Sequence, residues 1–318
     1  MALVSTLPRP AIVVHGGAGR WATDPDTRRR ALEAVRKAAH HGLEILLRGG
    51  LALDAVVEAI KVLEDSEVLN AGIGSVLTID GRIEMDAGLM DGCRGRGAGV
   101  GCVTYPKNPI VLAREVLERT DHVLLVGTAA DRFAQSLGLE EHPGPLPQRI
   151  EKYRELLRSR NLGYWKKVLD VAKVMGLDIG GTVGAVALDL EGCIAAGAST
   201  GGVWLKLPGR IGDSAIVGAG FYADSRVGGV SATGLGETIV MNFVARRVVE
   251  KMLSGLGLLQ ACLEIVKEHT QRFGRGTLGF VALDVRGNYV AIHNTECMPF
   301  AYACRDKVVV SMEGLRIV

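Results

Sequence analysis

The sequence lacks the cysteine spacing that holds a metal or an iron–sulfur cluster. Its six cysteines are scattered along 318 residues without a C-x-x-C pair, so they predict neither a zinc site nor a disulfide framework. An apolar run long enough to span a membrane is also absent, and residues 1–10 contain no apolar stretch of the kind found in a secretory signal. We therefore expect a soluble cytoplasmic protein that does not bind membranes.

An excess of charge of either sign is absent as well. The 37 lysines and arginines nearly balance the 35 aspartates and glutamates, and the net charge of +2 predicts no general attraction to nucleic acid. Asparagine and glutamine are sparse, which is one mark of thermophile proteins. The 42 glycines follow no repeat period, so a collagen-like or low-complexity chain is excluded.

The apolar patterns place strands in consecutive runs rather than in steady alternation with helices. We expect strands over 11–15, 75–79, 82–90, 100–105, 123–126, 182–190, 193–200, 215–222, 227–233, 278–285, 289–294, 300–304 and 307–312. Helices are expected over about 27–48 (with Asp26 or Thr27 as the N-cap), 52–65, 109–119, 127–137, 236–254 and 258–270.

Two physical rules turn this order into a fold class. Consecutive strands pair antiparallel, and strands rich in small apolar residues are buried on both faces. The sequence therefore predicts an α+β fold, a four-layer αββα sandwich of two stacked, mainly antiparallel sheets between helix layers.

Residues 138–181 differ in character from the rest of the chain. They begin with the proline-rich run EEHPGPLPQ and continue into a strongly charged helical pattern from Arg149 to Met175. Few of their side chains suit a core. We interpret this segment as a tether between two halves of a single domain that spans residues 1–318.

The Gly-Gly-Thr triplet at residues 180–182 precedes the apolar run VGAVALD, which is typical of a buried strand. Taken alone, the triplet fits a turn that enters the strand, and this interpretation is favoured for most such triplets. The alternative is that the peptide bond before Thr182 is left uncrowded by side chains so that a nucleophile can attack it.

Three clusters of polar residues follow, at 199–202, 207–214 and 231–237. Arg210 and Asp213 could bind the carboxylate and ammonium groups of an amino acid, or could instead pair with each other as a surface salt bridge. Thr233 and Gly234 precede a helix and offer an oxyanion site, unless Thr233 is an ordinary N-cap. No G-x-S-x-G motif supports a serine triad.

The glycine-rich run HGGAG at residues 15–19 follows the first expected strand. Its spacing is not G-x-G-x-x-G and no GK[ST] follows, so a nucleotide-binding protein is a remote alternative. The glycines instead predict that this backbone passes close beside another segment.

Several motifs together resemble the plant-type L-asparaginase/isoaspartyl peptidase family of N-terminal nucleophile hydrolases. In chain order they are HGGAG, NAGIGSVLTIDGRIEMDAGLMDG, GTVGAVALD, STGG, LPGRIGDS, ATGLGE and NTECM. The resemblance covers almost the whole chain and is weakest over 138–181. Two positions depart from it, because Gly180 stands before the Gly-Thr pair and Cys297 stands where a glycine is common.

The resemblance implies that the chain cuts itself between Gly181 and Thr182, which gives an α-chain of residues 1–181 and a β-chain of residues 182–318. The α-amino group freed on Thr182 would then act as the base for its own hydroxyl, so neither a histidine nor a catalytic cofactor is needed. Relatives assemble as (αβ)2, and we expect the same assembly here.

By this resemblance the catalytic residues surround Thr182. Thr200 would hydrogen-bond Thr182 and tune it, and Asn70 would lie beside the cleavage point. Thr233 and Gly234 would stabilise the oxyanion that forms when Thr182 attacks.

The substrate and a structural ion would bind next to these residues. Arg210 would bind the α-carboxylate of the substrate and Asp213 its α-amino group. The full substrate-binding set is Arg210, Ile211, Gly212, Asp213, Thr233, Gly234, Leu235 and Gly236. A sodium ion would be held by backbone carbonyl groups alone, those of Leu63, Glu64, Ser66, Leu69, Ala71 and Ile73.

The implied reaction is hydrolysis of L-asparagine to L-aspartate and ammonia, and of β-aspartyl (isoaspartyl) dipeptides, through a β-aspartyl ester on Thr182. One alternative is an aspartylglucosaminidase-type amidase, which the absence of a signal peptide disfavours. The other is an amino-acid-binding homologue that keeps Arg210 and Asp213 without catalysis, against which the presence of Thr182, Thr200 and Thr233 argues.

The scarcity of amide side chains leads to a first prediction about stability. We expect the purified protein to unfold above about 65 °C, the top of the usual mesophile range, in a scanning-calorimetry experiment. A midpoint within the mesophile range would contradict the assignment to a thermophile.

Overall fold

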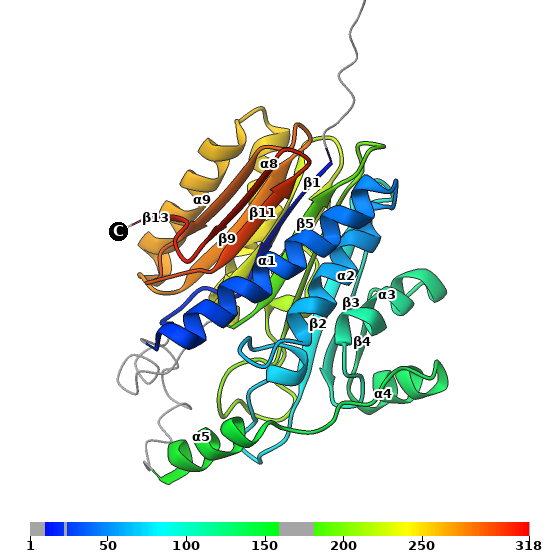
Figure 1. The fold of residues 1–318 in the computed structure, drawn as a ribbon, viewed down its shortest axis with the longest axis vertical. Helices are drawn as coiled ribbons and strands as arrows, with labels where there is room; N and C mark the ends of the chain where they lie inside the picture. Colours follow the sequence, from blue (N-terminus) through cyan, green and yellow to red (C-terminus); the bar gives the residue numbers. More distant parts are fainter. Residues whose placement is uncertain (1–9, 22–23, 159–180, 318) are drawn as a thin grey trace, which may run out of the picture.

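The strands form two sheets that stack face to face (Figure 1). The computed structural model describes residues 10–21, 24–158 and 181–317. Its strands are β1 (Ala11–His15), β2 (Met85–Asp91), β3 (Arg96–Val103), β4 (Leu124–Val126), β5 (Val183–Leu188), β6 (Ile194–Thr200), β7 (Phe221–Asp224), β8 (Gly228–Gly234), β9 (Leu278–Asp284), β10 (Tyr289–His293), β11 (Phe300–Cys304), β12 (Lys307–Ser311) and β13 (Leu315–Arg316).

Both sheets are mainly antiparallel, as consecutive strands predict. One sheet has eight strands in the order β12-β11-β1-β5-β6-β2-β3-β4, and the other has five in the order β13-β10-β9-β8-β7. The two parallel pairs are β3 with β4 and β10 with β13, each at the end of its sheet.

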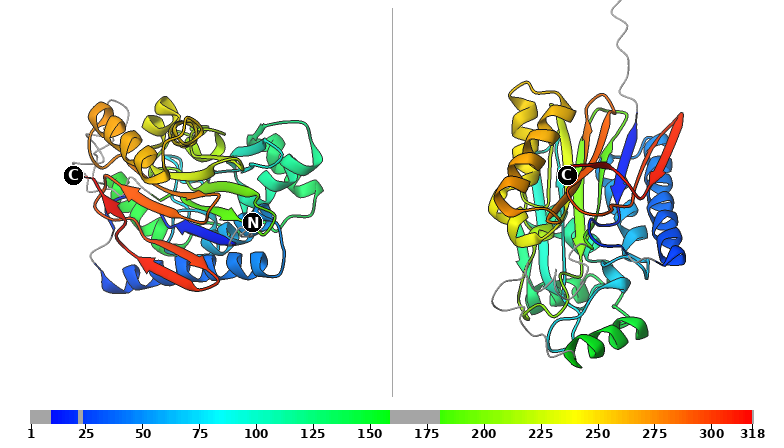
Figure 2. Two further views of the ribbon diagram at one scale, coloured as in Figure 1. Left: turned by 90° about the horizontal axis from the view of Figure 1, so that it is seen from above. Right: turned by 90° about the vertical axis from the view of Figure 1, so that its left-hand side faces the viewer.

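Helices cover the outer faces of both sheets (Figure 2). The eight-stranded sheet is covered by α1 (Pro25–Leu47), α2 (Ala52–Glu64) and α3 (Pro109–Arg119), and the five-stranded sheet by α8 (Val244–Leu253) and α9 (Leu258–Phe273). The remaining helices are η1 (Gly72–Gly74), α4 (Gly127–Ser136), α5 (Pro147–Arg158), η3 (Asp213–Ala215) and α7 (Gly236–Asn242). Within the described residues, none of them combines the length and apolarity needed to cross a bilayer.

Strand β5 shows how the layers are built. Because side chains alternate between the two faces of a strand, Ala185 and Ala187 pack with the helices outside the sheet, whereas Val186 and Leu188 pack between the sheets. Opposite Val186 lies Gly229 of the second sheet, where an added Cβ would come within 2.9 Å of the Val186 side chain. Small residues therefore let the sheets approach closely, and the predicted four-layer αββα sandwich is confirmed.

Several predicted boundaries are wrong, each for a local reason. The N-cap of α1 is Asp24 instead of Asp26 or Thr27, and its carboxylate accepts a hydrogen bond of 2.9 Å from the Thr27 N–H. The helix expected over 236–254 is broken at Phe243, which has a left-handed backbone (φ 47°) and separates α7 from α8.

Two expected strands do not form as predicted. The segment 75–79 is hydrogen-bonded to a loop instead of to a sheet, since the Ile79 N–H donates to Lys206 O at 2.9 Å and Leu205 N–H donates to Leu77 O at 2.8 Å. The segment 215–222 contains the end of η3 and a turn at Gly218, and β7 begins only at Phe221. Tight hydrogen-bonded turns thus replace regular strand geometry in both places.

The first part of the predicted tether packs against the domain. In α5 the side chain of Leu156 is buried, and the Tyr153 hydroxyl donates a hydrogen bond of 2.9 Å to Ile79 O. Upstream, His142 Nε2 lies 3.0 Å from Gly72 O. Only His142 and Leu156 are buried between residues 138 and 158, so the expectation that few side chains of this segment suit a core is confirmed there. Residues 159–180 lie outside the described part of the chain.

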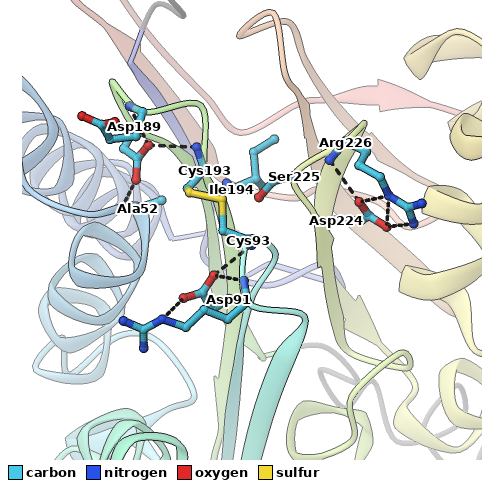
Figure 3. The surroundings of a disulfide bond; sticks show 11 residues. Ala52, Asp91, Cys93, Asp189, Cys193, Ile194, Asp224, Ser225 and Arg226 are labelled. Carbon is cyan, nitrogen blue, oxygen red and sulfur yellow. Dashed lines mark hydrogen bonds and ion pairs between the residues drawn. A yellow bond between two sulfur atoms is a disulfide. The ribbon is translucent and has the colours of Figure 1, made fainter.

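A disulfide between Cys93 and Cys193 joins two turns at one edge of the eight-stranded sheet (Figure 3). The two Cα atoms are 5.4 Å apart although 100 positions separate the residues. In the chain-entropy account, closing a loop of this length stabilises the folded state by roughly 4–5 kcal/mol. Scattered cysteines could not predict this pairing, because it depends on which turns the sheet brings together.

Candidate active site

The ends of three strands meet around Thr182, which directly precedes β5. Because Val183 is paired with Ser199, the neighbouring residues Thr182 and Thr200 lie side by side on β5 and β6. Thr182 is only 4% exposed. The small pocket at this point is lined by Gly181, Thr182, Thr200, Gly202, Val203, Arg210, Asp213, Gly234 and Gly236. The structure thus brings all three polar clusters of the second half into one place.

The backbone at Gly181 is crowded on two sides. An added Cβ would lie 2.3 Å from Asn70 Cβ, so no larger residue fits without a shift of the Asn70 loop. On the other side stands Gly17 (φ +107°), where an added Cβ would lie 3.0 Å from Gly181 Cα. The prediction that the HGGAG backbone passes close beside another segment is confirmed, and that segment contains Gly181, the residue before Thr182.

Asn70 is locked in place by three hydrogen bonds. Its side-chain amide donates to Gly202 O at 2.7 Å, its side-chain oxygen accepts from Val76 N–H at 3.0 Å, and its backbone oxygen accepts from Gly201 N–H at 3.0 Å. These bonds tie the loop before η1 to the loop after β6. Asn70 is therefore held in a fixed position beside the Gly181-Thr182 bond. Its catalytic role stays a prediction.

A buried histidine lies next to Thr182 in the sheet. His15 ends β1 and is paired with Gly184 of β5. Its Nε2 lies 3.0 Å from Ser231 Oγ, and that hydroxyl donates to Gly197 O at 2.8 Å. Complete burial lowers the pKa of His15 to about 3. At neutral pH the pocket therefore has an uncharged imidazole as its neighbour.

Arg210 and Asp213 sit in different environments. Arg210 Nε and Nη2 each donate at 2.9 Å to the two carboxylate oxygens of Glu237, a bidentate pair that fixes the plane of the guanidinium. Asp213 is only 2% exposed, and burial raises the pKa of its carboxyl to about 7 in spite of the nearby Arg210 charge. The alternative of a surface salt bridge between Arg210 and Asp213 is therefore wrong.

The loop that carries both residues is held down by Asp86 of β2. One carboxylate oxygen of Asp86 accepts from Gly212 N–H at 3.0 Å and the other accepts from Cys102 N–H at 2.9 Å. Ile211 packs against Gly101 of β3, where an added Cβ would lie 2.7 Å from its side chain. Ile211 and Gly212 therefore position the loop without lining the pocket that the described residues form.

Thr233 and Gly234 end β8 rather than capping a helix. The N-cap of α7 is Leu235, which has no side-chain cap hydrogen bond, so the N-cap alternative for Thr233 is wrong. The Thr233 hydroxyl is fully buried and accepts from Ala18 N–H at 3.2 Å. Gly234 has φ +141°, and an added Cβ would lie 2.3 Å from Thr277 O. Only glycine suits this position, where the backbone borders the pocket.

Thr200 faces the same pocket. Its hydroxyl accepts from Gly202 N–H at 3.0 Å, which orders the turn that follows β6. The expected hydrogen bond between Thr200 and Thr182 stays a prediction, as does the oxyanion role of Thr233 and Gly234.

The loop expected to hold sodium presents backbone oxygens to its own interior. Over Gly74, an added Cβ would lie 2.0 Å from Leu69 O and 2.8 Å from Ser66 O, and over Gly72 it would lie 2.5 Å from Glu64 O. Carbonyl oxygens of this kind are the ligands that hard cations prefer. Among the described residues no cluster of acidic, histidine or cysteine side chains could hold a metal ion, so any ion here depends on those carbonyls. Carbonyl oxygens are the type of donor that would hold a sodium ion, and the ion itself stays a prediction.

Sequence reasoning missed four residues that support the site: His15, Asp86, Ser231 and Glu237. His15, Asp86 and Glu237 stand inside quoted motifs, and Ser231 begins the polar cluster at 231–237, so these positions were the available signal. Their contacts join distant segments, and for those contacts the sequence has no local pattern.

The chain is similar to known proteins over most of its length. A family model described as asparaginase matches residues 8–312. The plant-type L-asparaginase of Pyrobaculum calidifontis is 44% identical over 292 residues, 90% of this chain and 94% of that protein. The plant-type L-asparaginase of Pyrococcus horikoshii is 44% identical, covering 92% and 95%. The isoaspartyl peptidase of Escherichia coli is 40% identical, covering 91% of each chain.

The crowding at Gly181 leads to a prediction about stability. In a Thr182→Ala background, which keeps chain cleavage out of the measurement, Gly181→Ala should lower the free energy of unfolding by about 1–3 kcal/mol because its Cβ overlaps Asn70. Denaturant unfolding measures the change. Gly257→Ala is the matched control, since a Cβ there meets nothing within 4 Å. Equal stability of the two variants would contradict the steric account.

Proposed function

The chain belongs to the asparaginase family, and from this premise we propose that it hydrolyses L-asparagine to L-aspartate and ammonia and also cleaves β-aspartyl (isoaspartyl) dipeptides. The observation that carries the proposal is the pocket in which Thr182, Arg210 and Asp213 meet. A hydroxyl nucleophile, a guanidinium and a carboxylate are the groups needed to attack an amide while holding an amino acid by its charged ends.

The enzyme first cuts its own chain. The Thr182 hydroxyl adds to the Gly181 carbonyl carbon, the Gly181-Thr182 C–N bond breaks, and the acyl group passes from nitrogen to oxygen as an ester. Water hydrolyses the ester, which leaves a carboxylate on Gly181 and a free amino group on Thr182. Support comes from the missing side chain at Gly181 and from the rigid Asn70 beside it.

The new amino group then serves as the base. An α-amino group has an ordinary pKa of about 7.7–8.0, so a useful fraction is neutral near pH 7 and can accept the Thr182 hydroxyl proton. The neighbouring His15 stays uncharged, since burial lowers its pKa to about 3, and so adds no positive charge that would disfavour protonation of the amine.

The hydrolytic cycle has two steps at Thr182. The hydroxyl attacks the side-chain carbonyl of asparagine, or the isopeptide carbonyl of a dipeptide, and ammonia or the amine half leaves with the proton. Water then hydrolyses the β-aspartyl ester and releases aspartate. Thr233 and Gly234 stabilise the oxyanion in both steps, and Thr200 orients the nucleophile.

Substrate binding relies on the contrast between Arg210 and Asp213. Arg210 binds the α-carboxylate, and Glu237 holds its guanidinium in one plane for that contact. Asp213 binds the α-ammonium, and its burial favours a cation that replaces lost water contacts. Ile211, Gly212, Leu235 and Gly236 supply the backbone that positions the two charged groups.

Three further features belong to the proposal. A structural sodium ion is held by the carbonyls of the loop from Leu63 to Ile73 and takes no part in catalysis. Two αβ units assemble as (αβ)2. The enzyme works in the cytoplasm of a thermophile, and the scarce amides of the sequence support the thermophilic source.

The role of Thr182 can be tested by substitution. Thr182→Ala should remain a single chain of 33.8 kDa in a denaturing mass measurement and lose asparaginase activity by on the order of 10⁴-fold or more. Thr182→Ser should keep cleavage and activity, and the exposed Thr128→Ala is the matched control.

Asparagine, β-aspartyl-leucine and N-acetylglucosaminyl-asparagine should be assayed together, to distinguish the proposed activity from that of an aspartylglucosaminidase-type amidase. Cleaved, active Thr182→Ala would overturn the mechanism.

The buried Asp213 predicts a pH dependence of substrate binding. Burial raises its pKa to about 7, and only the ionised carboxylate attracts the substrate ammonium. We therefore expect KM for asparagine to rise as pH falls below about 7, by up to tenfold per pH unit, whereas kcat follows the Thr182 amine. Asp213→Asn should raise KM and remove this dependence. A wild-type KM that stays constant between about pH 5 and 7 would contradict it.

A further inference from the structure

We propose that the Cys93–Cys193 disulfide joins the two chains of the mature enzyme covalently. The inference rests on the proposed cut between Gly181 and Thr182. Cys93 precedes the cut and belongs to the α-chain, whereas Cys193 follows it and belongs to the β-chain. The bond therefore crosses from one product chain to the other, and the cut leaves a single covalent molecule.

The sheet places the two cysteines next to each other. Cys93 follows β2 and Cys193 precedes β6, and these strands are neighbours with Asp91 opposite Ala195. Beyond the last strand pair, Gly92 N–H donates to Ile194 O at 2.8 Å. The two turns thus leave the sheet together at the same edge.

Each turn is also ordered by its own aspartate (Figure 3). Asp91 accepts from Cys93 N–H at 2.9 Å and from Arg94 N–H at 3.0 Å. Asp189 accepts from Cys193 N–H at 2.9 Å with one oxygen and from Ala52 N–H at 2.9 Å with the other. The sulfur atoms are therefore positioned by the fold, and little freedom is lost when they bond.

The disulfide lies far from the pocket. Thr182 directly precedes β5, and Cys193 follows its far end after a short turn. With six residues in β5 at about 3.3 Å each, about 20 Å separate the two ends. Reduction should therefore break the covalent link between the chains without touching the catalytic groups, so chain linkage and chemistry can be measured independently.

Two of the four remaining cysteines are poor competitors for exchange. Cys102, Cys262, Cys297 and Cys304 are free thiols. Burial raises the pKa of Cys102 to about 11 and raises that of Cys262 further, which disfavours the thiolate that exchange requires. Forming the bond removes two protons and two electrons from two thiols, and a small-molecule disulfide or dioxygen is the class of oxidant that accepts them.

The test is denaturing mass measurement of the alkylated wild-type enzyme with and without reductant. Without reductant we expect one species whose mass is that of the translated chain plus one water and minus two hydrogens, increased by alkylation of the four free thiols. With reductant we expect two species that meet at Gly181 and Thr182. Two separate chains already present without reductant would overturn the link alone. One uncut chain under both conditions would instead overturn the cut, and the link between chains with it.

Variants complete the experiment. Cys93→Ser and Cys193→Ser should each release two chains without reductant, while Cys304→Ser should behave as the wild type. The disulfide keeps the two chains together when the enzyme partly unfolds. Without it, the half-life of activity near the unfolding temperature should fall about tenfold or more in Cys93→Ser. Its activity at moderate temperature should stay unchanged. Wild-type heat resistance in Cys93→Ser, together with unlinked wild-type chains, would exclude the proposal.

Discussion

The steric crowding at Gly181 is the constraint on which the site depends. Asn70 and Gly17 approach its backbone from two sides, and both belong to loops that are held by hydrogen bonds to other segments. The chain can enter β5 only along this narrow path, so Thr182 is delivered to one place with one orientation. The strand that follows, β5, is buried on both faces, and its N-terminal end, directly after Thr182, lies nearest the pocket. The position of Thr182 is therefore determined by the backbone more than by side chains.

Burial shifts the pKa values of His15 and Asp213 in opposite directions, and both shifts favour the neutral form. His15 is made neutral and Asp213 is shifted toward neutrality, because both lie where water cannot solvate a charge. Arg210 keeps its charge and is paired with Glu237 at the rim. The unoccupied pocket thus contains fewer ionised groups than its composition implies. In the proposed function, an amino acid supplies a carboxylate for Arg210 and an ammonium group that favours the ionised form of Asp213, which an uncharged amide does not.

Much of this arrangement could be predicted from the sequence. The bounds of α3 follow from Pro109 and a clear helical period, and consecutive apolar strands were sufficient for the four layers. Motifs named every residue that lines the polar side of the pocket. The break at Phe243 could not be predicted, because no glycine or proline marks the position of this left-handed residue. The disulfide and the burial of Leu156 depend on contacts between distant segments, which no local pattern encodes. Asp86 and Glu237 stand inside quoted motifs, but their contacts with Gly212 and Arg210 could not be predicted from those motifs.

Strand β1 lies between β5 and β11, so a segment near the start of the chain is enclosed by two segments from its second half. For the proposed mature enzyme, this arrangement determines the order of folding and chain cleavage. In the uncut chain, β1 inserts between β5 and β11 in an intramolecular step. In separated chains, the same insertion would be a bimolecular association. Folding therefore has to come before maturation, and the fold of the working enzyme preserves a connectivity that the finished molecule no longer has.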